Sequence, residues 1–214
     1  MQKIKFYMDF LSPFTYFAWV NHSRLKAKYS AEFEYLPMMM GTLFTQHDIK
    51  GPGLIPAKRL YSLKHCFRYA HMNNIEFNPP KTHPFNPLYI LRMATLEASG
   101  EQQAKVIDLF WKLIWAQGEV LEDPDYILTK LQSNGIKNGA DILEKTFERN
   151  VKQAIKKNTK EALSHHAFGS PSFIINNELF WGNDSIEQME YYLQHGDQFD
   201  LELFKQRTSD IDLI

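Results

Sequence analysis

Hydrophobic and polar residues alternate at the start of the chain, and the spacing then becomes helical. The hydrophobic residues of the first stretch share one parity and the charged residues share the other: Ile4, Phe6 and Met8 against Lys3, Lys5 and Asp9. This period of two predicts a strand. Hydrophobic residues then recur at helical spacing from Phe14 to Leu25. Ser12 and Pro13 stand between the two patterns, and a serine N-cap followed by proline predicts that a helix begins there.

A second alternating stretch, residues 32–36, predicts a second strand after this helix. Two strands joined by a helix form a βαβ unit, in which the strands are parallel and the crossover is right-handed. Met38, Met39 and Met40 follow the second strand. This methionine run either lines an adaptable hydrophobic pocket or fills the core.

The middle of the chain predicts helices, and no strand pattern interrupts residues 57–165. The predicted helices cover residues 57–72, 88–100, 102–117, 124–135, 141–150 and 151–165. Glycines and prolines make residues 46–56 a loop, and prolines make residues 78–88 an extended connection.

Strand patterns return near the end of the chain. Residues 172–175 and 178–181 flank an Asn-Asn pair, which predicts the two-residue turn of a hairpin. A last helix follows, and Asp184 and Glu187 have the spacing of a capping box at its start. Residues 196–214 are polar and give little structural signal.

The order of these elements is β-α-β, then helices, then β-β-α, which predicts an α/β fold of the thioredoxin-like kind. We expect a four-stranded sheet with an inserted all-helical domain. The predicted thioredoxin-like domain comprises residues 1–45 and 166–214, and the inserted helical domain comprises residues 46–165.

Composition and charge exclude several classes of protein. Hydrophobic residues make up 44% of the chain and charged residues 23%, which is ordinary for a globular protein. The net charge of −1 gives no basic footprint for nucleic acid or an anionic membrane. No hydrophobic run approaches the roughly 18 residues of a membrane span. The strand pattern begins too early for a signal peptide to precede it, so we expect a cytoplasmic protein.

Cys66 is the single cysteine, which excludes an internal disulfide and a Cys-x-x-Cys redox pair. It lies in a predicted helix, where a packed and unreactive thiol is favoured over a nucleophile. No metal-binding cluster is visible, because His165 and His166 are adjacent rather than at ligand spacing. This pair is expected to end a helix.

Two polar residues lie at predicted helix starts, where chemistry is possible. Ser12 stands beside unpaired backbone N–H groups and the positive end of a helix dipole, a place that stabilises an anion such as a thiolate. The alternative is that Ser12 only caps the helix, although one hydroxyl can do both. Lys58 lies in a first turn, where the dipole disfavours a cation, so it either meets an anionic group or lies in solvent.

Four motifs resemble the family of 2-hydroxychromene-2-carboxylate isomerases and kappa-class glutathione transferases. They are residues 6–18, residues 56–58, residues 83–86 with 91–92, and residues 169–173 with 180–184. The resemblance spans the chain from about residue 3 to about residue 194. It implies the DsbA-like branch of the thioredoxin fold, with a helical domain inserted after the second strand.

The resemblance implies a glutathione-dependent enzyme in which Ser12 replaces the first cysteine of the redox motif. Ser12 would donate a hydrogen bond to the glutathione sulfur and stabilise it as a thiolate. Ser170 precedes the expected cis-proline, Pro171, and its backbone would pair antiparallel with the cysteinyl part of glutathione.

Four further residues are assigned by the same resemblance. Asn183 and Asp184 would hold the γ-glutamyl end, and Lys58 would meet the glycyl carboxylate. The alternative is that Asp184 serves only in the capping box. Trp181 would form a wall of the cleft, and a core tryptophan is an equally fair interpretation.

The implied reaction is isomerisation of a conjugated aromatic substrate of the 2-hydroxychromene-2-carboxylate type, with a small molecule as the partner and a homodimer as the assembly. A kappa-like glutathione transferase is the alternative. A disulfide oxidoreductase is disfavoured because Ser12 and Thr15 stand where a dithiol is needed. A non-catalytic thioredoxin-like binding module is a further alternative, because Ile49 and Ser185 replace the asparagine and arginine of relatives.

Overall fold

A computed structural model describes residues 2–209 and residue 211 of the chain. Residues 1, 210 and 212–214, at the two ends of the predicted thioredoxin-like domain, lie outside the described residues. No helix in the described part of the chain combines the length and hydrophobicity that crossing a bilayer requires.

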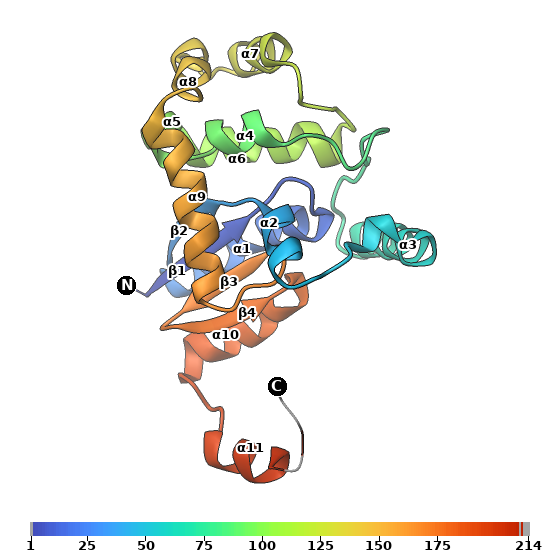
Figure 1. Ribbon diagram of the computed structural model, residues 1–214, viewed down its shortest axis with the longest axis vertical. Coiled ribbons are helices and arrows are strands. Elements are labelled where there is room, and N and C mark those ends of the chain that lie inside the picture. Colours follow the sequence, from blue (N-terminus) through green and yellow to red (C-terminus); the bar gives the residue numbers. More distant parts are fainter. Residues whose placement is uncertain (1, 210, 212–214) are drawn as a thin grey trace.

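The fold is built on a four-stranded sheet with the order β2-β1-β3-β4 (Figure 1). The strands are β1 (Lys3–Met8), β2 (Glu32–Pro37), β3 (Ser172–Ile175) and β4 (Glu178–Trp181). Strands β1 and β2 are parallel, and α1 (Pro13–Tyr29) connects them. Strand β3 is antiparallel to both β1 and β4. The thioredoxin-like sheet predicted from the sequence is therefore confirmed.

Helices cover both faces of the sheet because neighbouring residues of β1 are buried on opposite sides. Phe6 lies 6.2 Å from the Trp19 ring of α1, measured between ring centroids. Tyr7 joins a separate buried cluster with Ala162 of α9 (Arg149–Ser164). Helix α10 (Ile186–His195) packs beside α1, and α2 (Met40–Gln46) packs beside α9. In Figure 1, α9 therefore crosses one face of the sheet, while α1 and α10 cover the other.

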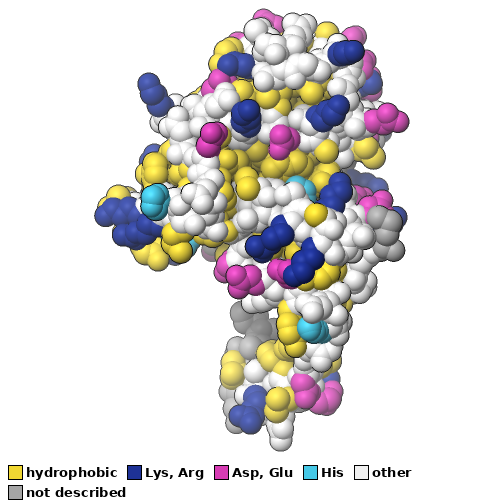
Figure 2. All heavy atoms as spheres, turned by 180° about the vertical axis from the view of Figure 1, so that it is seen from behind, with side chains coloured by type: hydrophobic (Ala, Val, Ile, Leu, Met, Phe, Trp, Pro, Cys, Tyr) yellow, Lys and Arg dark blue, Asp and Glu magenta, His cyan; other side chains and the backbone are white. Residues whose placement is uncertain are grey.

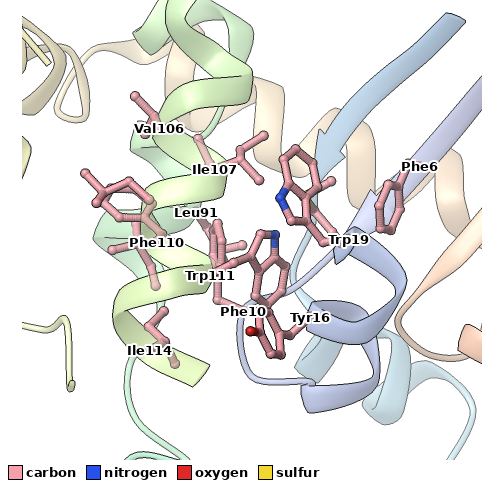
Figure 3. Close-up of a cluster of buried hydrophobic side chains, with 14 of the residues drawn as sticks. Phe6, Phe10, Tyr16, Trp19, Leu91, Val106, Ile107, Phe110, Trp111 and Ile114 are labelled. Carbon is pink, nitrogen blue, oxygen red and sulfur yellow. The ribbon is translucent and has the colours of Figure 1, made fainter. Parts of the chain in front are cut away.

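The segment between α2 and α9 is helical, as the sequence predicts. It contains η1 (Pro52–Leu54), α3 (Pro56–Met72), α4 (Leu88–Met93), α5 (Leu96–Ser99), η2 (Gly100–Gln102), α6 (Gln103–Trp111), the π-helical turn η3 (Lys112–Ala116), α7 (Pro124–Ser133) and α8 (Gly139–Lys145). Its core continues into the core of the sheet. Trp111 of α6 lies 4.5 Å from Phe10, measured between ring centroids, and faces Tyr16 and Trp19 of α1 (Figure 3).

Three differences from the predicted elements have local or tertiary causes. The helix predicted over residues 88–100 is divided, because Thr95 caps α5 by accepting a hydrogen bond from the Ala98 N–H. Helix α2 was not predicted, and its first N–H, that of Met40, bonds the distant Asp9 carboxylate. Helix α11 (Leu201–Thr208) forms in the stretch of little signal, where the Asp200 carboxylate caps it.

The capping box predicted at the start of α10 is wrong. Asp184 lies inside a short 3₁₀ turn, η4 (Asn183–Ser185), and α10 begins after it at Ile186 without a side-chain cap. The three residues of the methionine run differ in burial. Met38 fills the core, whereas Met39 and Met40 are half-buried.

Candidate active site

Ser12 is the N-cap of α1, directly after β1. Its backbone is extended, with φ −97° and ψ 114°, and its Oγ accepts a hydrogen bond from the Thr15 N–H at 3.3 Å. Its backbone carbonyl accepts the N–H groups of Thr15 and Tyr16 at 3.1 and 3.3 Å. The side chain therefore lies at the positive end of the α1 dipole, as the sequence predicts. Ser12 is only 6% exposed.

The loop before β3 brings Ser170 against Ser12. The Ser170–Pro171 peptide bond is cis. Ser12 Oγ donates a hydrogen bond to the Ser170 carbonyl at 2.9 Å. Ser170 Oγ in turn accepts the Asp9 N–H at 3.0 Å and lies 2.9 Å from Thr15 Oγ1. The two serines that the family resemblance assigns thus form one hydrogen-bonded cluster with Thr15.

Asp9 is a buried carboxylate in this cluster that the sequence reasoning did not select. Its Oδ1 accepts the Leu11 N–H at 3.0 Å and its Oδ2 accepts the Met40 N–H at 2.8 Å. Burial raises the pKa of Asp9 to about 6, and the two hydrogen bonds oppose this rise. A charged residue at the end of a strand, three positions before Ser12, was the signal that could have identified it.

His83, in the connection between α3 and α4, contacts the turn that joins β1 to α1. Its Nε2 lies 2.8 Å from the Leu11 carbonyl and donates to it, since a carbonyl can only accept. Burial lowers the pKa of His83, the nearby Arg59 charge lowers it further, and the Leu11 bond opposes both. Trp115 adds a second support by donating to the Phe10 carbonyl at 2.9 Å. The helical segment therefore fixes the backbone that leads into Ser12.

The turn that contains Asn183 and Asp184 is joined to the cis-proline and to α1. The Gly182 N–H donates to the Pro171 carbonyl at 3.0 Å. Asn183 Oδ1 accepts a hydrogen bond from the Asn21 amide of α1 at 2.9 Å. Asp184 is exposed, so its carboxylate is open to a ligand. These contacts place the turn next to the Ser170–Pro171 loop.

Trp181 is not a core residue. It is 48% exposed, and its ring lies 4.8 Å from that of Phe168, measured between centroids. Gly169 lies directly beneath it, because a Cβ added there would come within 2.6 Å of Trp181 Nε1. The indole therefore stands over the residue that precedes Ser170, which is suitable for the wall of a cleft.

Lys58 is the predicted site residue that the structure does not bring into contact with the others. It lies in the exposed first turn of α3 and lines a shallow groove of about 380 Å³ with Pro52, Ala57, Tyr61 and Ser62. A neighbouring groove of about 500 Å³ runs along α3 past Arg59 and Leu60. The Lys58 ammonium is therefore free to meet an anion in solution.

The cluster can stabilise an anion but carries no thiol of its own. Thr15 occupies the place where the second thiol of a redox pair would be needed, and its hydroxyl contacts Ser170. Cys66 is buried in α3, and burial raises the pKa of its thiol to about 12, so it is unreactive as the sequence predicts. Residues 2–209 and 211 contain no group of three or more side chains able to hold a metal ion.

Comparisons with known proteins agree with the fold. The family model described as DSBA-like thioredoxin domain matches residues 3–194. Glutathione S-transferase kappa 1 of Caenorhabditis elegans is 23% identical, over 97% of this chain and 98% of the relative. The 2-hydroxychromene-2-carboxylate isomerase of Sphingobium xenophagum is 25% identical, over 89% of this chain and 97% of the relative.

Solved structures share the fold. A 2-hydroxychromene-2-carboxylate isomerase superposes with a TM-score of 0.78 at 19% identity, covering 97% of this chain and 98% of the other. The cytosolic disulfide reductase DsbM of Pseudomonas aeruginosa, solved with GSH, superposes with a TM-score of 0.60 at 15% identity, covering 96% of this chain and 98% of the other.

Proposed function

The chain belongs to the DSBA-like thioredoxin domain family, and from this premise we propose that it is a glutathione-dependent enzyme. We propose further that it isomerises a small conjugated aromatic substrate of the 2-hydroxychromene-2-carboxylate type. One observation carries this proposal: the start of α1 presents Ser12 and Thr15 rather than cysteines, and Cys66 is buried elsewhere. The chain supplies no thiol at this site, which supports a thiol brought by a bound ligand.

The residues around Ser12 are suitable for glutathione. The β1–β3 ladder ends at the pair Tyr7 and Ser172, so the backbone of Ser170 is not used by the sheet and can pair with a peptide. Bound glutathione supplies a thiol nucleophile to the site. Ser170 and Pro171 would hold its cysteinyl part, Asn183 and Asp184 its γ-glutamyl end, and Lys58 its glycyl carboxylate.

The role of Ser12 is to keep the ligand sulfur ionised. Its hydroxyl donates a hydrogen bond to the thiolate, and the start of α1 adds the positive end of its dipole. Together they lower the thiol pKa from its free value of about 8.5. Each pKa unit corresponds to about 1.4 kcal/mol of stabilisation of the thiolate. Trp181 forms one wall of the cleft and can contact an aromatic substrate.

Two positions reduce the number of contacts that glutathione could make. Ile49 is a half-buried hydrophobic residue and offers no polar group. Ser185 is buried, and its hydroxyl donates to the Gly182 carbonyl at 2.8 Å, so it closes the turn instead of providing a cation. We therefore expect glutathione to bind weakly, with a Kd approaching the millimolar range.

A kappa-class glutathione transferase is the second candidate. It is favoured by the relative of that class that aligns over 97% of this chain, and it needs the same residues. In a transferase the activated thiol is consumed by an electrophile, whereas an isomerase returns it unchanged. The two functions therefore differ in whether glutathione is used up.

The deciding experiment combines binding and turnover. Calorimetry with glutathione should show binding at millimolar concentration, and a chromene-type carboxylate should isomerise only when glutathione is present. Consumption of glutathione with chlorodinitrobenzene, without isomerase activity, would favour the transferase. Absence of binding at millimolar thiol would leave only a thioredoxin-like binding module, and thiol–disulfide exchange in place of both activities would indicate an oxidoreductase.

The proposed function also has consequences for location and assembly. Reduced glutathione is abundant in the cytosol, which favours a cytoplasmic protein.

We propose a homodimer with a second copy covering α3. The exposed large hydrophobic residues of this helix and its preceding turn are Leu54, Leu60, Tyr61, Leu63, Phe67 and Met72. In Figure 2, α3 lies at the left edge of the molecule, where hydrophobic side chains lie beside Lys, Arg and His side chains.

A further inference from the structure

The hydroxyl hydrogen of Ser12 is already bonded to a group that the proposed ligand also needs. Ser12 Oγ donates to the Ser170 carbonyl at 2.9 Å and accepts the Thr15 N–H at 3.3 Å. A serine hydroxyl has one hydrogen to donate. While this hydrogen lies on the Ser170 carbonyl, it is not available to an ionised sulfur.

The Ser170 carbonyl is held in place, so the hydroxyl hydrogen is the group that must move. Ser170 Oγ accepts the Asp9 N–H at 3.0 Å, and the next carbonyl, of Pro171, accepts the Gly182 N–H at 3.0 Å. The Ser12 hydrogen turns about the Cβ–Oγ bond without moving the oxygen. Oγ can therefore keep the Thr15 N–H while its hydrogen points elsewhere.

A buried carbonyl that loses its hydrogen bond is destabilised unless another donor replaces the first. Ser170 is buried, and the sheet offers it no replacement because the ladder ends at Ser172. An amide N–H that pairs antiparallel with Ser170 is such a donor. A simple alkyl thiol has none, so it can take the Ser12 hydrogen only by leaving the Ser170 carbonyl unpaired.

On the basis of the proposed function, we infer that a ligand amide N–H replaces Ser12 on the Ser170 carbonyl and thereby releases the Ser12 hydroxyl to the ligand sulfur. Peptide recognition and thiol activation are then one exchange of hydrogen bonds. The amide between the γ-glutamyl and cysteinyl residues becomes a specificity determinant. Ser12 activates thiols of cysteinyl peptides and leaves simple alkyl thiols unactivated.

The test compares glutathione with an ester analogue in which oxygen replaces this amide N–H. Calorimetry sets saturating concentrations, and ultraviolet absorbance of the thiolate reports the pKa of each bound thiol. The α1 dipole acts on both bound thiols, whereas the Ser12 hydrogen bond is released only to glutathione, so we expect the pKa of bound glutathione to lie about one unit below that of the bound ester.

Each other outcome counts against the exchange. An equal fall for both ligands would overturn it and leave the proposed function intact. An ester that does not bind would overturn it too, because the N–H would then serve binding rather than activation. If glutathione itself neither binds nor shows a lowered thiol pKa, the exchange and the proposed function fail together.

A second measurement uses S-methylglutathione, which keeps the amide N–H and has no thiol to ionise. Ser12→Ala removes the competing donor from the Ser170 carbonyl. We therefore expect S-methylglutathione to bind to Ser12→Ala about threefold more tightly than to the wild type. Ser23→Ala is the matched control, because Ser23 is exposed on α1 and its hydroxyl donates to the Val20 carbonyl of the same helix at 3.0 Å. Equal or weaker binding to Ser12→Ala, with its fold verified by circular dichroism, would overturn the exchange.

Discussion

The carboxylate of Asp9 accepts a hydrogen bond from the backbone N–H of Met40 at 2.8 Å, which ties the end of β1 to the first turn of α2. The side chain is 1% exposed, and its partners are backbone N–H groups rather than a cation. Burial without a cationic partner disfavours the charged form of this carboxylate. Its position three residues before Ser12 indicates that it organises the turn between β1 and α1 at a cost in stability.

Asp9→Asn should change how stability depends on pH. The pKa of Asp9 is about 6 in the folded state and about 3.9 in the unfolded state, so the folded state binds the proton more tightly. This stabilisation is fully present below pH of about 4 and is lost as the pH rises through about 6. We expect the free energy of unfolding of the wild type to fall relative to Asp9→Asn by up to about 3 kcal/mol between these limits. Urea unfolding of both proteins across this range measures the difference, and a difference independent of pH would contradict the burial effect.

Ser12→Ala should lose thiol activation. We expect the pKa of bound glutathione to rise by about one unit and kcat/KM to fall about tenfold, since one unit is about 1.4 kcal/mol. Loss of the N-cap should also lower the free energy of unfolding by about 1 kcal/mol. Steady-state kinetics, thiolate absorbance and urea unfolding separate the two effects. Ser23→Ala should match the wild type in all three, and full turnover in Ser12→Ala would remove Ser12 from the mechanism.

Lys58→Ala should weaken glutathione binding without changing the chemical step. The ammonium is exposed, so its attraction for the glycyl carboxylate is modest and screened by salt. We expect KM for glutathione to rise about two- to fivefold at low salt, with kcat unchanged, and the effect to shrink in high salt. Lys105→Ala is the control, because Lys105 is an exposed lysine of α6 and does not lie on α3. Equal effects of the two substitutions would indicate general charge rather than a contact.

Gly182→Ala should strain the turn that presents Asp184. Gly182 has φ 92° and ψ 160°, a conformation available essentially to glycine, and an added Cβ would meet the Asp184 carboxylate. We expect the free energy of unfolding to fall by about 1–3 kcal/mol and glutathione to bind more weakly. Gly41→Ala is the control, since a Cβ there meets nothing within 4 Å. Unfolding and calorimetry on both variants test this, and unchanged binding in Gly182→Ala would place the γ-glutamyl site elsewhere.

Leu60→Glu should dissociate the proposed dimer. Leu60 is 57% exposed on α3, and a buried unpaired carboxylate opposes association. Light scattering should give a dimer mass for the wild type and a monomer mass for Leu60→Glu. The control is Leu96→Glu on α5, where the leucine is 63% exposed and the dimer should persist. A wild-type monomer, or a dimer that survives Leu60→Glu, would contradict the role of α3.

Local patterns in the sequence were sufficient for most of the architecture. Alternation marked β1 and β2, two short strand-like runs around an Asn-Asn pair marked β3 and β4, and Ser12 followed by Pro13 marked the start of α1. The Asn176–Asn177 turn was equally readable, and both residues adopt the positive φ that such a turn needs. These features depend on residues close together in the chain, so the chain alone contains their cause.

The chemistry of the site depends on contacts between distant parts of the chain, and no local pattern encodes these. Ser12 and Ser170 are separated by 158 positions, yet one hydroxyl bonds the other's carbonyl. Asp9 is polar in the alternation of β1, and only folding buries it and directs it at Met40. Helix α2 and the bond from His83 to Leu11 arise in the same way, because packing supplies a partner that neighbouring residues do not.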